Sequence, residues 1–378
     1  MVMDPSRWLI PDSHKNASCV DKWDQDHVRL PYSDRNLYPA DDNEVINRWC
    51  LIQTALRKSI KSSFDLEDAI LSYNNRFAES WNFRALHKYC NEVLNNEERD
   101  LLFNSVVPKM IDLTCSLPNI CPEPIPLIKS GTNRIIVLSQ KQISCLLANA
   151  FFCTFPRRNA SNYRRKHSHE YANYPHINFD TLFASGRLKV EKLKFIMHYF
   201  NRIFESEPTG VVSFQRKCLD QFPDWSRSER KISNCKLHVS AEGTIEDFGI
   251  GMLQVDFANE FIGGGVLNYG AVQEEIRFLI NPELLVSMLF MEKMKSNEAI
   301  IITGCERYSN YAGYGDSLHF LSDHRDITNR DPVGRRQTEI VAMDALPYYK
   351  NSLVQFSTQC IKRELNKVII LPVKLKFV

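Results

Sequence analysis

Two adjacent glutamates, Glu274 and Glu275, follow a run of three glycines in the middle of the chain. The glycines are Gly263–Gly265, and seven residues separate them from Gln273, which directly precedes the glutamates. Glycine permits positive φ and close backbone approach, and successive N–H groups of such a loop can cradle phosphate oxygens. A carboxyl group beside that loop can donate a proton to a breaking bond. The pattern predicts a site that binds a phosphate-containing ligand and performs acid–base chemistry on it.

Each part of this pattern also has an ordinary structural interpretation. A glycine triplet alone is usually a flexible turn, and adjacent glutamates at a helix start usually form a solvated face that complements the helix dipole. Adjacent helical residues point about 100° apart, so both glutamates can face one bond only at an irregular helix start. The combination with a predicted strand end, where Asp256 and Asn259 lie, favours the functional interpretation.

Short β-rich runs in the second half of the chain supply the elements that would position this site. Predicted strands cover residues 236–240, 252–257, 299–303, 338–343 and 368–376, and predicted helices cover 287–294 and 353–365. Strands that alternate with helices indicate an α/β sheet covered by helices. Ligands bind such sheets at the carboxyl ends of strands, which is where the glycine loop begins.

The first half of the chain predicts helices. Residues 1–45 are polar and show little periodicity, so we expect an extended N-terminal arm there. Apolar residues then recur at helical spacing from Ile46 to Leu56, and a further helix is expected from Ser139 or Gln140 to Phe152. The expected organisation is therefore an arm over 1–45, a helical accessory region over 46–204 and an α/β domain over 205–378.

Composition excludes several classes of protein. The chain has 378 residues, of which 44% are hydrophobic and 24% charged, so it is not disordered throughout. A net charge of +2 gives no overall basic field for non-specific nucleic-acid binding. The 11 cysteines are odd in number and include no CxxC pair, which favours a reducing compartment. The longest apolar-rich stretch, 145–155, is too short to cross a bilayer, and no signal peptide is evident.

The stretch from GGG to QEE resembles the signature of the poly(ADP-ribose) glycohydrolase family. Flanking segments resemble the animal members closely, among them VDFAN and RFLINPEL on either side of the signature, and KWDQDHVRLP, LLANAFFCTFPRRN, ITGCERYSNYAGY and TEIVAMDAL elsewhere. The resemblance extends from about residue 20 to about residue 367. It implies a macrodomain-like α/β catalytic domain with a mixed sheet and flanking helices, preceded by a helical region.

The same resemblance implies an activity, a glycosidase reaction that hydrolyses the ribose–ribose O-glycosidic bond of poly(ADP-ribose) and releases ADP-ribose. It implies no metal or redox cofactor. The expected mechanism has a glutamate as general acid, an oxocarbenium-like transition state, and a water activated by the same glutamate.

The resemblance also assigns roles residue by residue. Glu275 matches the catalytic acid, Glu274 the residue that holds the ribose hydroxyls, and Asp256 a residue that supports the site. The residues matched to substrate binding are Asn259 near the ribose, Gly263, Gly264 and Gly265 as the diphosphate loop, Gln273 beside the acids, Ile245 and Glu246 at the adenine, Tyr314 closing over the ligand, and Tyr311 on the same loop.

Expectations about the biological setting follow from the family as well. The partners are protein-attached poly(ADP-ribose) and the ADP-ribose product, with no membrane and no sequence-specific nucleic acid, and the chain is expected to be a monomer. Nuclear and cytoplasmic residence, with roles in carbohydrate metabolism and the DNA damage response, is what the resemblance implies.

The C-terminal end departs from the family pattern. After KRELNK the chain reads VIILPVKLKFV, an apolar and β-prone tail, where the family continues with a second glycine-rich phosphate loop and an aromatic residue that stacks on adenine. We therefore expect a C-terminally truncated domain. The alternative function is a catalytically impaired protein that binds ADP-ribose or poly(ADP-ribose).

Two further clusters have competing interpretations. Basic residues gather at Arg157, Arg158 and 164–169, where a solvated loop competes with a patch for the polymer's phosphates, and the pair His167 and His169 lacks the neighbours of a metal site. Tyr308, Tyr311 and Tyr314 have helical spacing, but the glycines around them indicate a loop over the site.

Overall fold

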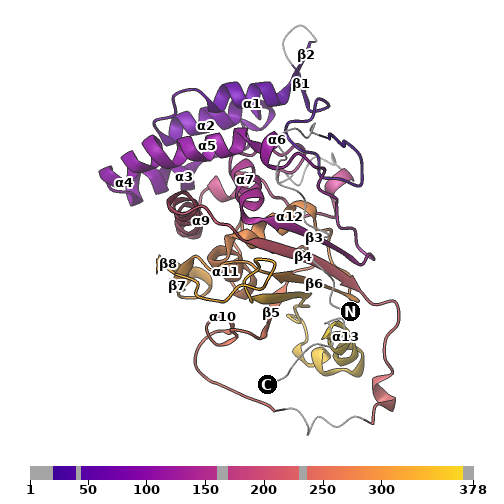
Figure 1. Cartoon of the computed structure of the whole chain (residues 1–378). Coiled ribbons are helices and arrows are strands. Elements are labelled where there is room, and N and C mark those ends of the chain that lie inside the picture. The colour runs from indigo at the N-terminus through magenta and orange to yellow at the C-terminus, as the bar shows by residue number, and fades with distance from the viewer. Residues whose placement is uncertain (1–19, 40–43, 160–168, 230–235, 369–378) are drawn as a thin grey trace.

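The computed structural model describes residues 20–39, 44–159, 169–229 and 236–368. Figure 1 shows a layer of helices from the first half of the chain packed on one side of a sheet region, with the C-terminal elements on the other side. No helix among these residues is both long and apolar enough to span a membrane.

A five-stranded mixed sheet lies at the centre of the fold. Its order is β3 (Arg134–Ser139), β4 (Val211–Cys218), β6 (Glu298–Thr303), β9 (Glu339–Asp344) and β5 (Leu253–Ala258). Strand β5 pairs parallel with β9, with Asp256 opposite Ala342, and the other three pairings are antiparallel. The sheet confirms the predicted mixed α/β architecture, and the predicted strands over 252–257, 299–303 and 338–343 are confirmed within a residue at each end.

One strand of this sheet, β3, comes from the first half of the chain, so the prediction that this half is helical is only partly right. Strand β3 lies inside the region expected to be wholly helical, and it pairs along its length with β4. The run Arg134–Ser139 is apolar and β-branched at its centre, and its burial on the sheet outweighs the helical pattern around it. The helical region and the sheet therefore share one backbone hydrogen-bond network.

Several other predicted elements differ from the structure. Residues 236–240 form no strand and are exposed. The predicted strand over 368–376 falls outside the described residues except for Val368, which ends a helix. The helix predicted over 287–294 ends at Phe290, and the one over 353–365 is interrupted at Ser357, between a 3₁₀ turn and the last helix.

Helices of the first half form the layer above the sheet in Figure 1. The predicted helix from Ser139 is confirmed as α7, and the Ser139 hydroxyl accepts from the Gln142 N–H as its N-cap. The elements are the short pair β1 (Leu37–Pro39) and β2 (Val45–Asn47), followed by α1 (Arg48–Leu56), α2 (Ser63–Ser72), η3 (Asn75–Phe77), α3 (Arg84–Lys88), η4 (Tyr89–Val93), α4 (Asn96–Leu101), η5 (Leu102–Val106), α5 (Val107–Cys115), α6 (Leu117–Ile120), α7 (Gln140–Phe151), η6 (His169–Tyr171), α8 (Asp180–Phe183) and α9 (Arg187–Glu205).

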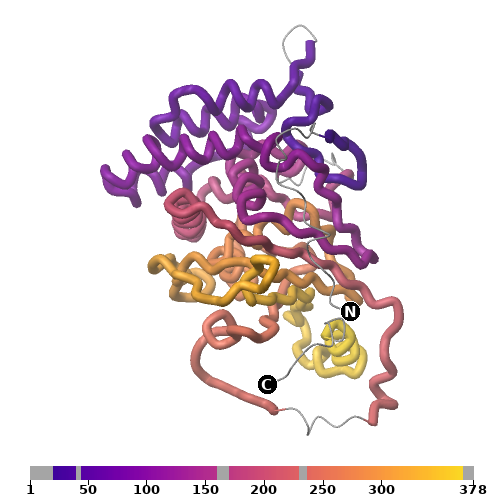
Figure 2. The backbone as a smooth tube through the Cα atoms, in the orientation of Figure 1, coloured from indigo at the N-terminus to yellow at the C-terminus, as the bar shows by residue number. Residues whose placement is uncertain are grey.

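The second half adds shorter helices and a hairpin around the sheet. They are η7 (Trp225–Arg227), α10 (Ile245–Phe248), α11 (Gln273–Ile280), η9 (Pro282–Val286), α12 (Ser287–Phe290), the hairpin β7 (Ser309–Ala312) and β8 (His319–Asp323) with η10 (Gly315–Ser317) at its turn, η11 (Ser352–Phe356) and α13 (Thr358–Val368). Figure 2 shows the described parts of the connection from β4 extending away from the body and returning through α10 to β5.

The two faces of the sheet are covered unequally. Residues that alternate along the strands separate into a large core cluster, which includes Ile300, Ile302 and Ala342, and a small one formed by Ala299, Ile301 and Val341. Because strand side chains alternate between faces, Asp256 lies on the face of β5 that carries buried Ala258 of the large cluster. Helix α11 packs against β5, which brings the two glutamates to that strand.

Candidate active site

Helix α11 begins beside the carboxyl end of β5, and Gln273 joins the two. Strand β5 is the last strand of the sheet, so one side of its backbone has no neighbouring strand among the described residues. The Gln273 side chain replaces that neighbour, because its oxygen accepts from the Phe257 N–H at 2.9 Å and its amide donates to the Val255 carbonyl at 2.9 Å. Gln273 therefore fixes the start of α11 against β5.

Glu274 is held by the backbone that follows the strand. One carboxyl oxygen accepts from the Asn259 N–H at 2.9 Å and the other from the Gly263 N–H at 2.7 Å. The Asn259 side chain accepts from the Phe261 N–H and so shapes the first turn of the loop. Asn259 and the first glycine of the triplet therefore position this acid.

Glu275 is held by the other part of the same loop. Its Oε1 accepts from the Gly265 N–H at 2.8 Å, and its Oε2 accepts from the Val272 N–H at 2.9 Å. The second contact places Glu275 in the capping position of the first turn of α11, so the helix start itself orients the carboxyl group. Both glutamates are almost fully buried. Each oxygen retains a second lone pair, so either carboxyl can also carry a proton.

These contacts change the interpretation of the glycine triplet. The sequence-based hypothesis assigned its N–H groups to a diphosphate. In the structure the N–H groups of Gly263 and Gly265 donate to the two glutamates, and that of Gly264 donates to the Phe261 carbonyl. The triplet therefore positions the acids, because the loop folds back over the start of α11 and directs two of its donors at the carboxylates. Contact of the triplet with a diphosphate stays a prediction.

Asp256 lies behind the glutamates and is also buried. Within the described residues neither of its carboxyl oxygens has a hydrogen-bond partner. Burial raises the pKa of Asp256 to about 7, with Arg277 opposing and Glu275 adding to the rise. Burial, followed by the charge of Asp256, raises the pKa of Glu274 well above its ordinary value, while the N–H groups of Asn259 and Gly263 oppose that rise. Asp256 and Glu274 therefore keep their protons to a higher pH than exposed acids do.

This pKa shift predicts how stability depends on pH. The folded chain keeps the Asp256 proton up to about pH 7, whereas the unfolded chain loses it near its ordinary pKa of 3.8. The contribution of Asp256 to stability is therefore present at low pH and is lost as pH rises through about 7. In urea unfolding, the stability of Asp256→Asn relative to the wild type should rise by on the order of 3 kcal/mol between pH 5 and pH 8.

The exposed acid Asp220 supplies the control for that measurement. Asp220→Asn should leave the stability difference between pH 5 and pH 8 as it is in the wild type. An Asp256→Asn variant with the same pH dependence as the wild type would show that Asp256 ionises freely in the folded chain.

Lys192 of α9 also belongs to the site, although the sequence did not single it out. It is fully buried, and its Nζ donates to the carbonyls of Val266 and Asn268, both at 2.8 Å, in the loop that carries the glycines. One sequence feature could have identified Lys192: it lies four residues after Leu188 and three before Phe195, on the apolar face of an amphipathic helix. A lysine on a buried face requires a partner.

Ile245 and Glu246, expected near adenine, lie on α10, and Tyr311 and Tyr314 lie on the hairpin. The Tyr311 hydroxyl donates to Glu246 Oε1 at 2.7 Å, which joins β7 to α10, and Ile245 is partly buried at the start of that helix. Tyr314 lies at the turn of the hairpin with its ring largely exposed, and the Gly315 N–H donates to the Ala271 carbonyl at 2.8 Å. This bond brings the Tyr314 turn next to the start of α11.

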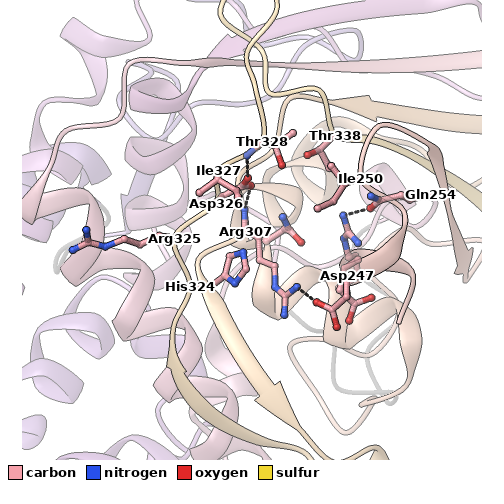
Figure 3. Close-up of a pocket in the computed structure, with 13 residues that line it drawn as sticks. Asp247, Ile250, Gln254, Arg307, His324, Arg325, Asp326, Ile327, Thr328 and Thr338 are labelled. Carbon is pink, nitrogen blue, oxygen red and sulfur yellow. Dashed lines mark hydrogen bonds and ion pairs between the residues drawn. The ribbon is translucent and has the colours of Figure 1, made fainter. Parts of the chain in front are cut away.

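A pocket of about 240 Å³ lies between α10, α11 and the segment after β8. Most of its lining residues, including Glu246, are charged or polar. Figure 3 shows Asp247 directed at Arg307, and Gln254 at a guanidinium group. The guanidinium of Arg307 donates to Asp247 at 2.5 Å, and that of Arg277 donates to Gln254 at 2.5 Å. Neither the glycine triplet nor Glu274 and Glu275 line this pocket, so it is separate from the paired acids.

The remaining candidates have structural roles where they are described. Arg157 pairs with Glu170 on the surface. Arg158 is buried and donates to the carbonyls of Met288 and Leu289, so it is not free for a polymer's phosphates. Residues 164–168 lie outside the described residues. Tyr308, Tyr311 and Tyr314 were all expected in a loop over the site. Tyr308 is instead buried, and its hydroxyl donates to Glu283. No group of three potential metal ligands occurs among the described residues.

Comparisons with known proteins agree with this fold. Residues 222–371 match the model of the macro domain fold of poly(ADP-ribose) glycohydrolase, and residues 94–216 match the model of its helical domain. Together the two models cover more than half of the chain. The chain belongs to the poly(ADP-ribose) glycohydrolase family.

Individual relatives are similar over most of the chain. It is 40% identical over 300 residues to poly(ADP-ribose) glycohydrolase 1 of Arabidopsis thaliana, an alignment of 74% of this chain and 52% of that protein. It is 36% identical over 304 residues to the probable poly(ADP-ribose) glycohydrolase 2 of the same plant, covering 72% of this chain and 56% of the relative. Poly(ADP-ribose) glycohydrolase 1 of Caenorhabditis elegans is 37% identical over 62% of this chain and 28% of its own length. The chain thus spans about half the length of the plant relatives.

Proposed function

We propose that the chain is a glycosidase that hydrolyses the ribose–ribose O-glycosidic bonds of poly(ADP-ribose) and releases ADP-ribose. Family membership supports the substrate class and the reaction type. The observation that carries the proposal for this chain is the placement of Glu275 at the start of α11, where Gly265 and Val272 fix both carboxyl oxygens.

Glu275 acts as general acid in this proposal. The leaving group is a ribose hydroxyl, which requires a proton as the glycosidic bond breaks. Bond cleavage leaves an oxocarbenium-like ribose, and the resulting carboxylate of Glu275 stabilises its positive charge. The same carboxylate then removes a proton from the attacking water, which restores the acid. Because both oxygens are fixed by backbone N–H groups, the carboxyl needs little reorganisation between these steps.

The neighbouring carboxyl groups support this chemistry. Glu274 presents a buried carboxyl held by Asn259 and Gly263, a suitable partner for the ribose hydroxyls. Asp256 and Glu274 have raised pKa values, so near neutral pH they do not add two full negative charges beside a substrate that already carries a diphosphate. Tyr311 and Glu246 form the wall proposed for adenine, and Tyr314 is free to close over the ligand because its ring is largely exposed.

The proposal is tested by incubating the whole chain with purified poly(ADP-ribose) and quantifying released ADP-ribose by chromatography. We expect release that is linear in time, with a rate proportional to the concentration of the chain. Added ADP-ribose should inhibit this release. Calorimetric titration with ADP-ribose on the same preparation separates the alternative function. Binding without release would show that the chain is a poly(ADP-ribose)-binding protein and not an enzyme. If the chain neither binds ADP-ribose nor releases it from the polymer, both functions are contradicted.

We also propose that the chain acts on protein-attached poly(ADP-ribose) in the nucleus and cytoplasm, as a monomer, within the DNA damage response and carbohydrate metabolism. A fluorescent fusion, examined before and after induced DNA breaks, tests the location, and light scattering of the purified chain tests the monomer. Exclusion from the nucleus, or a stable dimer, would contradict the corresponding part.

A further inference from the structure

The carbonyl groups of the loop after the glycine triplet converge on one ammonium group. Lys192 Nζ lies 3.1 Å from the Gly265 carbonyl and 2.8 Å from those of Val266 and Asn268, and it also donates to the carbonyl of Gly270. The loop closes around it, since the N–H groups of Asn268 and Gly270 both donate to the Gly265 carbonyl, at 2.8 and 3.1 Å. An ammonium group has three donors and no acceptor, so four carbonyl oxygens satisfy all of its hydrogens.

The loop requires this positive charge in order to fold as it does. Carbonyl oxygens carry partial negative charge, and here four of them gather around the buried Lys192 side chain, in the loop that also donates to the carboxyl of Glu275. Without a cation their mutual repulsion is not offset by water. Burial lowers the pKa of Lys192 to about 7, while Glu275 acts in the opposite direction. The lysine and the acid are therefore coupled across the loop that separates them.

Lys192 reaches Glu275 through a short sequence of contacts. The ammonium binds the Gly265 carbonyl, and the N–H of Gly265 donates to Glu275 Oε1 at 2.8 Å. Gly270, whose carbonyl is also bound, is two residues before Val272, and the N–H of Val272 donates to Glu275 Oε2. Both donors that orient the carboxyl group thus lie in or beside the segment that Lys192 holds closed.

We propose that Lys192 is a positioning residue for Glu275: its ammonium group, supplied by α9, keeps the loop 265–270 closed and thereby orients the acid. The inference rests on the proposed function only for its effect on rate. It also gives the helical region a specific role at the site, because α9 precedes the matched macro domain in the chain and reaches the catalytic loop through this side chain.

The first test replaces the charge and keeps the stem. Lys192→Met should lower kcat for ADP-ribose release by about 10- to 100-fold, because small displacements of a catalytic group cost rates of that size. KM should change less than about threefold, since the ligand-facing groups remain. The control is Lys194→Met, which removes a partly exposed lysine on the same helix whose partner is Glu191. A Lys192→Met enzyme with kcat within twofold of the control overturns the proposal.

A second test uses the unaltered chain and requires no activity. If Lys192 ties the loop to α9, the amides of the loop should be protected as those of the helix are. The hydrogen-exchange rate of a peptide covering 262–272 should then lie within about tenfold of that of a peptide covering 190–203. A loop peptide that exchanges more than tenfold faster is not held by the helix and overturns the proposal. If the chain releases no ADP-ribose, the proposed function fails, whereas fast exchange of the loop would still overturn the role of Lys192.

Discussion

Glu275→Gln is expected to lower kcat for ADP-ribose release by about 10³-fold, within the range that general acid catalysis contributes. The amide cannot protonate the leaving ribose oxygen, and it cannot remove a proton from water in the second step. Its shape is otherwise that of the acid, so ADP-ribose should bind within a few-fold of the wild type. The measurement is a progress curve of released ADP-ribose, with calorimetric titration of the product on the same samples.

A matched control separates the chemistry from the local structure. Glu275 accepts the Val272 N–H at 2.9 Å in the first turn of α11, and Glu98 accepts the Asn95 N–H at 2.9 Å in the first turn of α4. Glu98→Gln makes the same change in a helix cap that lies in the layer above the sheet in Figure 1. Its activity should equal that of the wild type. A Glu275→Gln enzyme within tenfold of this control would remove Glu275 from the role of general acid.

The sequence predicted the sheet and the motif better than it predicted their connections. Strands β5, β6 and β9 are strongly β-branched or alternate in polarity, so their pattern is visible in a short window. Strand β3 is a short run between a proline-rich loop and a helix, and its identity as a strand depends on β4, which follows about 70 residues later. Pairing at that separation leaves no periodic signal in the sequence, so the pattern does not predict strand β3.

The candidate site shows the same division. Asp256, Asn259 and the QEE triplet lie within twenty residues of one another, so a single motif contains them. Lys192 is more than seventy residues from the loop it binds, and only the folded chain shows that contact. The motif also does not predict where the glycine N–H groups point. A loop that cradles phosphate and a loop that holds two carboxylates require the same residue types.

The two interpretations of the triplet lead to different results for Gly264→Ala. Gly264 has φ of +49°, and an added Cβ would lie 2.5 Å from Glu275 Oε1 and 2.6 Å from Glu274 Oε2. Both carboxyl groups would have to move, which weakens the bonds from Gly263 and Gly265 at 2.7 and 2.8 Å. We expect kcat to fall by about 100-fold. Stability in urea, without any ligand, should fall by about 2–4 kcal/mol, from two weakened buried hydrogen bonds and the left-handed backbone.

Gly251→Ala isolates the cost of the backbone conformation. Gly251 has φ of +75° and no atom within 4 Å of an added Cβ, so this variant should lose about 1–2 kcal/mol and keep the wild-type kcat. If the triplet mainly cradled a diphosphate, Gly264→Ala would weaken ADP-ribose binding and leave ligand-free stability equal to that of Gly251→Ala. A loop that holds the carboxylates requires two results for Gly264→Ala. Its kcat falls, and its ligand-free stability falls by more than that of Gly251→Ala.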